Sequence, residues 1–224
     1  MKLLPSILAA LLLVGCSAVP RLRTVDSATR AAIEQQCRAR FPGGSWRAVH
    51  TIHARMPLGY RSAMIGIAVG SAEQDRLRLV AMAPEGMTLL DAIHHQGRVQ
   101  LVRAVPPFDR LAFVHGMLAD VRMLFFAPQG KPTAVGKLKG GHAVCRWRAR
   151  DGSVIDVHPR TPEQWGIKRY DPSGSLIRTA WSTGPVQQGF NDRVVLRSHG
   201  LGAYTLKLKL LRSARAPPPP RPTP

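Results

Sequence analysis

Eight histidines are the side chains of this 224-residue sequence most suited to binding a metal ion or moving protons. His50 and His53 are three residues apart in one alternating stretch, and His94 and His95 are adjacent in another. Residues an odd number apart on a β-strand point to opposite faces of the sheet, so neither pair can hold one ion. No cysteine and histidine spacing matches a zinc site either. The sequence therefore predicts neither a metal nor a cofactor.

Nucleophiles and paired carboxylates also lack a catalytic pattern. The sequence contains no Gly-x-Ser-x-Gly motif, which would place a serine on a sharp turn in an α/β-hydrolase. Acidic residues number only 13, and Asp151 and Asp171 are explained by turns. Asp91 lies in an apolar stretch, where it either pairs with an arginine or faces solvent at a sheet edge. We therefore expect a protein that is not an enzyme.

Cys16 is the first of three cysteines and directly follows an apolar run. The run over residues 3–14 is shorter than the roughly 20 residues that span a bilayer. With Lys2 before it and small residues after it, the run is typical of a secretory signal. The alternative is a plain signal peptide that happens to be followed by a cysteine.

The ending Leu13-Val14-Gly15-Cys16 resembles the lipobox of bacterial lipoproteins. That resemblance implies removal of a signal peptide over residues 1–15 and acylation of Cys16 on its sulfur and its new amino group. Two or more acyl chains anchor a protein stably to a membrane. Ser17 stands where an aspartate would resemble an inner-membrane retention signal. The resemblance therefore implies an outer-membrane, lipid-anchored protein whose domain lies in the periplasm and whose first partner is membrane lipid.

The formal net charge of +19 favours an anionic partner. Export from the cytoplasm argues against nucleic acid, and anionic lipid headgroups are the natural alternative. The arginines are spread along the sequence rather than gathered in one run. An equally good interpretation is that they line solvated strand faces.

Cys37 and Cys145 remain as an even pair in an oxidising compartment, which favours a disulfide between them. Such a bond would fix the first predicted helix to a strand of the sheet. The alternative is two buried free thiols.

Two segments have the spacing of helices. Residues 27–41 place apolar side chains at helical intervals, with Ser27 as the expected cap. Residues 106–128 do the same, with Asp109 as the expected cap and apolar side chains recurring every three or four residues. The apolar stripe of this second helix must cover something, most simply the concave face of a curved sheet.

Alternating apolar and polar residues, interrupted by Gly and Pro, predict an antiparallel sheet with one solvated face. The predicted strands are residues 45–56, 60–70, 76–83, 88–95, 97–105, 143–150, 153–158, 165–171, 175–181, 193–197 and 203–211. The fold class is thus mainly β with α, a curved antiparallel sheet of about 11 strands. We expect a lipidated tether over residues 16–26, a domain over 27–212 and a Pro-rich, disordered tail over 213–224.

This order of elements behind a lipobox resembles the carrier and the outer-membrane receptor of the bacterial lipoprotein-localisation pathway, and a family of outer-membrane lipoproteins related to that receptor. The similarity lies in residues 76–99, in Ala-Val-Pro-Pro-Phe-Asp-Arg at 104–110, and in the closing Gly202-Ala203-Tyr204. It implies a LolA/LolB-like fold, a half-open β-barrel lidded by helices, with an apolar cavity for acyl chains. Fold resemblance alone does not fix function.

The resemblance implies that an apolar cleft binds an acyl chain or lipoprotein anchor and helps lipid or lipoprotein transfer. Its expected lining is Ile52, Ala63, Ile65, Ile67, Leu77, Leu79, Val114, Leu118 and Val121. The receptor's exposed apolar loop would correspond to the turn containing Met56 and Leu58. The alternative is a lipid-tethered scaffold that docks on an envelope complex and binds no lipid. A cavity favours the first function, whereas a fully packed core favours the second.

Overall fold

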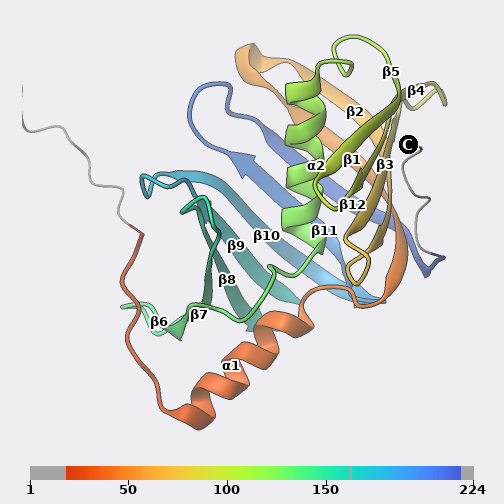
Figure 1. Ribbon diagram of the computed structural model, residues 1–224. Helices are drawn as coiled ribbons and strands as arrows, with labels where there is room; N and C mark the ends of the chain where they lie inside the picture. Colours follow the sequence, from red (N-terminus) through yellow and green to blue (C-terminus); the bar gives the residue numbers. More distant parts are fainter. Residues whose placement is uncertain (1–18, 162, 218–224) are drawn as a thin grey trace, which may run out of the picture.

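A computed structural model describes residues 19–161 and 163–217 of the chain (Figure 1). The predicted signal peptide over residues 1–15, the lipid attachment site Cys16 and the last seven residues of the Pro-rich tail lie outside the described residues. All helices and strands reported below therefore fall within residues 19–217.

One twelve-stranded antiparallel sheet forms the body of the protein. Its strands are β1 (Ser45–Arg55), β2 (Arg61–Ser71), β3 (Arg76–Met82), β4 (Thr88–His95), β5 (Arg98–Ala104), β6 (Ala134–Lys137), β7 (Ala143–Arg148), β8 (Val154–Thr161), β9 (Gln164–Tyr170), β10 (Leu176–Gln187), β11 (Phe190–Ser198) and β12 (Thr205–Arg215). Consecutive strands pair as two meanders, β1–β5 and β6–β12, and the pairing of β1 with β12 joins them. The sheet curves without closing (Figure 1), which confirms the predicted mainly β half-barrel.

Strand β6 was not predicted, and several boundaries differ from those predicted. β6 is four residues long and includes Gly136, so it carries almost no alternation. Arg23 forms an isolated bridge with Lys137 of this strand, and residues 19–26 thus lie partly against the sheet rather than forming only a tether. At the other end, β12 continues to Arg215, beyond the predicted start of the tail.

Helix α1 (Ser27–Ala39) packs against β6, β7 and β8 (Figure 1). Asp26, and not Ser27, caps it, since the Asp26 carboxylate accepts a hydrogen bond of 2.9 Å from the backbone N–H of Thr29. Ile33 and Cys37 form its buried side. The predicted cap was wrong by one residue because aspartate is an equally good cap.

Helix α2 (Leu111–Phe125) lies across the concave side of the sheet, as its apolar stripe predicted (Figure 1). It begins at Leu111 after a flanking Arg110 that makes no side-chain cap, so the prediction that Asp109 caps it was wrong. Leu111, the first residue of this helix, is apolar but exposed.

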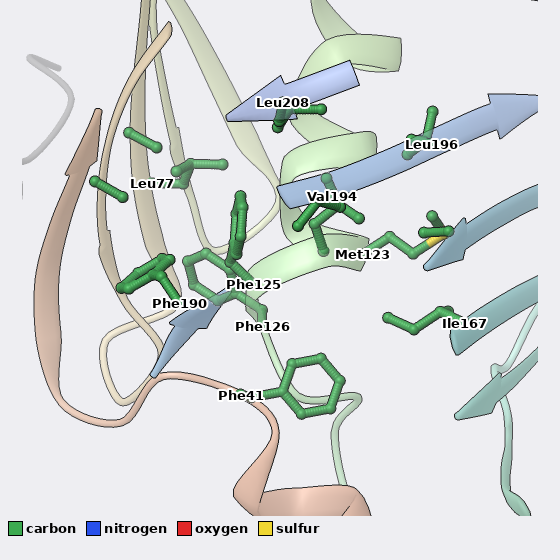
Figure 2. Packing of buried hydrophobic residues seen from close by; sticks show 14 of the residues in the cluster. Phe41, Leu77, Met123, Phe125, Phe126, Ile167, Phe190, Val194, Leu196 and Leu208 are labelled. Carbon is green, nitrogen blue, oxygen red and sulfur yellow. The ribbon is translucent and has the colours of Figure 1, made fainter. Parts of the chain in front are cut away.

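Aromatic side chains fill the middle of the half-barrel (Figure 2). Trp46 of β1 makes edge-on contacts with Phe125, Phe126 and Phe190, with ring centroids 5.1–5.8 Å apart. Phe125 and Phe126 come from the end of α2, and Phe190 comes from β11. Such rings bury large apolar areas. The cluster therefore joins α2 to both meanders, and it leaves little space at the centre of the half-barrel.

Strand β2 turns the opposite face inward from the one predicted. Ala63 is exposed and Ile65 and Ile67 are half-buried on the convex side, whereas Met64 and Ala68 are buried. The reason is that inward positions opposite large side chains are occupied by glycine. A Cβ atom on Gly66 would lie 2.5 Å from Ile52, and one on Gly70 would lie 2.3 Å from the Trp46 ring. Glycine made the buried face look less apolar than the solvated one.

Replacing Gly70 by alanine is expected to lower the free energy of unfolding by about 1–3 kcal/mol, because the new methyl group collides with the rigid, buried Trp46 ring. Denaturant unfolding of the purified variant measures this loss. Gly43→Ala is the matched control, since an added Cβ there meets no atom within 4 Å. Equal stability of the two variants would contradict the close contact.

Candidate functional site

A cleft of about 340 Å³ lies at the open side of the half-barrel, between α2 and the two ends of the sheet. One wall comes from β4 and β5, the opposite wall from the β7–β8 hairpin and β9, and the floor from α2 and the residues that follow it. It is lined by His94, Gly97, Val99, His115, Leu118, Ala119, Arg122, Met123, Phe126, Ala127, Pro128, Gln129, Ala149, Asp151, Ser153, Ile155 and Arg169. Its size is at the lower end of the range for ligand pockets.

The cleft combines an apolar floor with two cationic lining residues. Leu118, Met123 and Phe126 are buried at its base. Arg122 and Arg169 lie among the polar lining residues. A site of this composition is suited to an amphiphilic ligand rather than to a purely apolar one.

Arg122 is held in place by three neighbours. Its guanidinium lies 2.6 Å from a carboxylate oxygen of Asp75 in the β2–β3 turn, and 3.0 Å from Nδ1 of His94. The same group lies over the Phe126 ring, 5.2 Å from its centroid. Because arginine can only donate, Nδ1 of His94 must accept and Nε2 carries the proton. Partial burial and the nearby Arg122 charge lower the pKa of His94, which keeps its ring neutral.

Asp120 fixes the other side of α2 to the sheet. Its carboxylate accepts a hydrogen bond of 3.0 Å from Nε of Arg178 on β10 and another from the hydroxyl of Tyr204. Burial raises the pKa of Asp120, while the Tyr204 and Arg178 contacts oppose that shift. Asp120 and Arg122 together tie the helix to both halves of the sheet, so the floor of the cleft is firmly positioned.

Of the nine residues predicted to line an apolar cleft, only Leu118 borders this one. Leu77, Leu79 and Val114 are buried in the packed core, and Ile52 and Val121 are half-buried outside the cleft lining. The three β2 residues of that prediction face the convex side, as described above. The predicted position was wrong because the aromatic cluster fills the centre of the half-barrel and displaces the cleft to its open side.

The polar lining of this cleft was not predicted from the sequence. Arg169 is a concave-face position on β9, two residues after the buried Ile167. The available signal was a positively charged residue on the face of β9 that is otherwise apolar. It was weak because Arg78 and many other arginines occupy convex positions.

Two other predicted contacts are present. Cys37 and Cys145 form a disulfide that joins α1 to β7. Asp91 makes a two-pronged ion pair with Arg78 on the neighbouring strand, at 2.6 and 3.0 Å. This pair settles the alternatives for Asp91 in favour of an arginine partner and gives it a structural role.

The turn between β1 and β2 presents an exposed apolar side chain. Leu58 is 94% exposed and has a positive φ of 60°, while Met56 is half-buried. Leu201, in the β11–β12 turn, is also fully exposed. Because Arg55 pairs with both Arg61 and Thr205, these two turns lie at the same end of the sheet (Figure 1).

Two larger hollows lie elsewhere. One of about 420 Å³ follows β8–β10 and is lined by His158 and Trp181, which alternate with core residues and therefore face the convex side. Another, of about 750 Å³, lies beside the loop after α1 and the β10–β11 turn. Neither contacts α2, so neither is bordered by the helix that covers the concave face.

Within residues 19–161 and 163–217, no three histidine, cysteine or acidic side chains come together as a metal site. In the same part of the chain, no helix combines the length and apolar character needed to cross a bilayer.

Neither protein-family models nor curated proteins match this sequence. Solved structures do match the fold. A LolA superfamily protein from Nitrosomonas europaea has a TM-score of 0.51 at 11% identity, over 85% of this chain and 94% of that one. An outer membrane lipoprotein-sorting protein domain from Vibrio parahaemolyticus has a TM-score of 0.48 at 12% identity, over 85% and 93%. A DUF1329 family protein from Desulfovibrio piger has a TM-score of 0.46 at 8% identity, over 86% and 94%.

Proposed function

We propose that this chain, which has a LolA-like half-barrel fold, is an outer-membrane lipoprotein that binds an acyl chain in its cleft. In this function, residues 1–15 are the signal peptide and Cys16 carries the lipid. The domain lies in the periplasm and helps transfer lipid or lipoprotein cargo. It is not an enzyme, it needs no cofactor, and its partners are membrane lipid and cargo rather than nucleic acid.

The cleft between α2 and the sheet edges is the observation that carries this proposal. A closed barrel or a fully packed sandwich would have no opening on its concave side. Here the aromatic cluster fills the centre, but a cleft of about 340 Å³ remains next to the floor formed by Leu118, Met123 and Phe126. Burying an acyl chain there would gain about 25 cal/mol for each Å² of apolar surface removed from water, before the costs of binding.

The exposed turn containing Leu58 supports contact with a membrane during delivery. Arg55 and Arg61 flank the turn and Leu201 lies at the same end. An apolar side chain can enter the headgroup region, and each nearby arginine adds about 1 kcal/mol of attraction to an anionic leaflet. The turn and the cleft then provide contact and cargo binding in one domain.

Ala119→Trp is expected to abolish acyl-chain binding. Ala119 lines the cleft and is half-buried, so an indole there occupies the space without removing a core side chain. The chain from residue 17 onward keeps every described element and can be secreted and purified without detergent. Native mass spectrometry and lipid extraction would then report any bound acyl chain.

Ala112→Trp is the matched control, because Ala112 is exposed on the same helix and does not border the cleft. The natural chain and this control should carry or take up an acyl chain, and Ala119→Trp should not. If the natural chain carries no lipid and also fails to bind a fluorescent fatty acid, the proposal is wrong. The chain would then fit the scaffold alternative, and cross-linking in the envelope would identify the complex on which it docks.

A further inference from the structure

Arg169 differs from four other well-positioned arginines of the domain in having no carboxylate within ion-pair distance. Ion pairs of 2.6–3.0 Å join Arg78 to Asp91, Arg122 to Asp75, Arg146 to Asp156 and Arg178 to Asp120. Arg169 lies beside Arg178 in the β9–β10 register, yet it forms no ion pair with any residue of the described chain. It is half-buried, and its Nε is shielded from solvent without a hydrogen-bond partner.

Asp120 and Asp151 attract Arg169 only from beyond ion-pair distance, so the desolvation of this partly buried guanidinium is only weakly compensated. Asp151 is the acidic side chain that lines the same cleft. One of its oxygens already accepts a hydrogen bond of 2.9 Å from the Ser153 backbone N–H, which fixes it in the β7–β8 turn. No carboxylate of the described residues therefore pairs directly with Arg169, which leaves its guanidinium available to an anionic group from outside the protein.

The residues around Arg169 indicate what kind of ligand would carry such an anionic group. Arg169 pairs in register with Ile155, and both line the cleft. The apolar floor begins with Leu118 and Met123, and Arg122 of the same helix, which is paired with Asp75, adds a second cation to the lining. A ligand that satisfies Arg169 thus has an apolar part directly attached to an anionic group.

We propose that the cleft selects single-chain amphiphiles with an anionic head group, a carboxylate or a phosphate, whose head pairs with Arg169. This inference rests on the proposed function and names its ligand class. The planar guanidinium matches either anion through two parallel hydrogen bonds. The acyl chain then extends along Leu118, Met123 and Phe126.

The test compares three ligands with the same sixteen-carbon chain: hexadecanoate, hexadecyl phosphate and hexadecanol. Each displaces a fluorescent fatty acid from the chain that begins at residue 17, at lipid concentrations below the micellar range. The natural chain should bind at least one of the two anions about tenfold or more tightly than hexadecanol, since hydrogen bonds to charged groups are the stronger ones. Which anion binds more tightly distinguishes a fatty acid from a phospholipid-like ligand.

Arg169→Gln should weaken anion binding about ten- to a hundredfold and leave hexadecanol binding unchanged. Arg169→Lys should recover part of the loss, because lysine restores the positive charge but not the paired N–H donors of the guanidinium. Arg197→Gln is the matched control, since it removes one positive charge from an exposed position outside the cleft. Thermal unfolding verifies that each variant is folded.

The outcomes separate this inference from the function on which it rests. If hexadecanol binds as tightly as both anions, or if Arg169→Gln affects all three ligands equally, Arg169 does not select the head group and only this inference fails. If none of the three ligands displaces the fluorescent fatty acid from a folded chain, and the fatty acid itself does not bind, the proposed function fails with it.

Discussion

Removing the disulfide between Cys37 and Cys145 is expected to lower the free energy of unfolding by about 5 kcal/mol. The bond closes a loop across a sequence separation of 108 residues, and a loop of that length restricts the unfolded chain strongly. Both sulfur atoms are fully buried, at the contact between α1 and β7. Apart from this bond, Ile33 is the main apolar side chain by which the helix is anchored.

Urea unfolding of the chain from residue 17 onward, which lacks Cys16, measures this loss. The oxidised natural chain is compared with the double variant Cys37→Ala/Cys145→Ala and with the natural chain under a reductant. Both forms without the disulfide should unfold at lower urea concentrations than the oxidised natural chain, and by similar amounts. A double variant within 1 kcal/mol of the oxidised chain would show that the bond does not stabilise the fold.

Acidification from pH 7 to pH 5 is expected to cost the fold about 4 kcal/mol through two buried histidines. Burial lowers the pKa of His50 and that of His158 to about 4. The unfolded chain binds a proton at each site near pH 6.5, whereas the folded chain excludes it until about pH 4. Stability is therefore complete above pH 6.5 and falls as the pH drops towards 4.

His50→Leu should remove about half of this pH dependence. His50 is buried against Phe125, and its Nε2 has no hydrogen-bond partner among the described residues, so leucine costs little at pH 7. His53→Leu is the matched control, because His53 lies exposed on the opposite face of the same strand. Urea unfolding from pH 5 to pH 7 reports the slopes. An unchanged slope in His50→Leu would contradict a buried, neutral His50.

Much of the architecture could be predicted from local patterns. Strand β1 alternates between buried and more exposed residues, with Trp46, Ala48 and His50 pointing inward. Its buried face therefore follows from the sequence of this strand alone. The Gln96-Gly97 turn adopts the positive φ angles that a tight hairpin needs. The apolar stripe of α2 required a surface to cover, and the concave sheet supplies it.

The inward face of β2 could not be predicted, because it depends on a partner strand. Gly66 and Gly70 are buried where Ile52 and Trp46 lean across from β1, and the alternation of β2 alone favours the wrong face. Which face is buried depends on the combined volume of the side chains on both paired strands, and the sequence of one strand describes only one of the two.

The sequence by itself determined the predominantly antiparallel β fold and the helix that covers the sheet, and it favoured the pairing of Cys37 with Cys145 that the structure shows. Each depends on spacing along the chain or on the number of cysteines. Only the tertiary structure decided where the cleft lies and which arginine lines it without an ion pair. Those features depend on how much space the aromatic cluster leaves and on which charges meet across strands, and both are set by contacts between residues far apart in sequence.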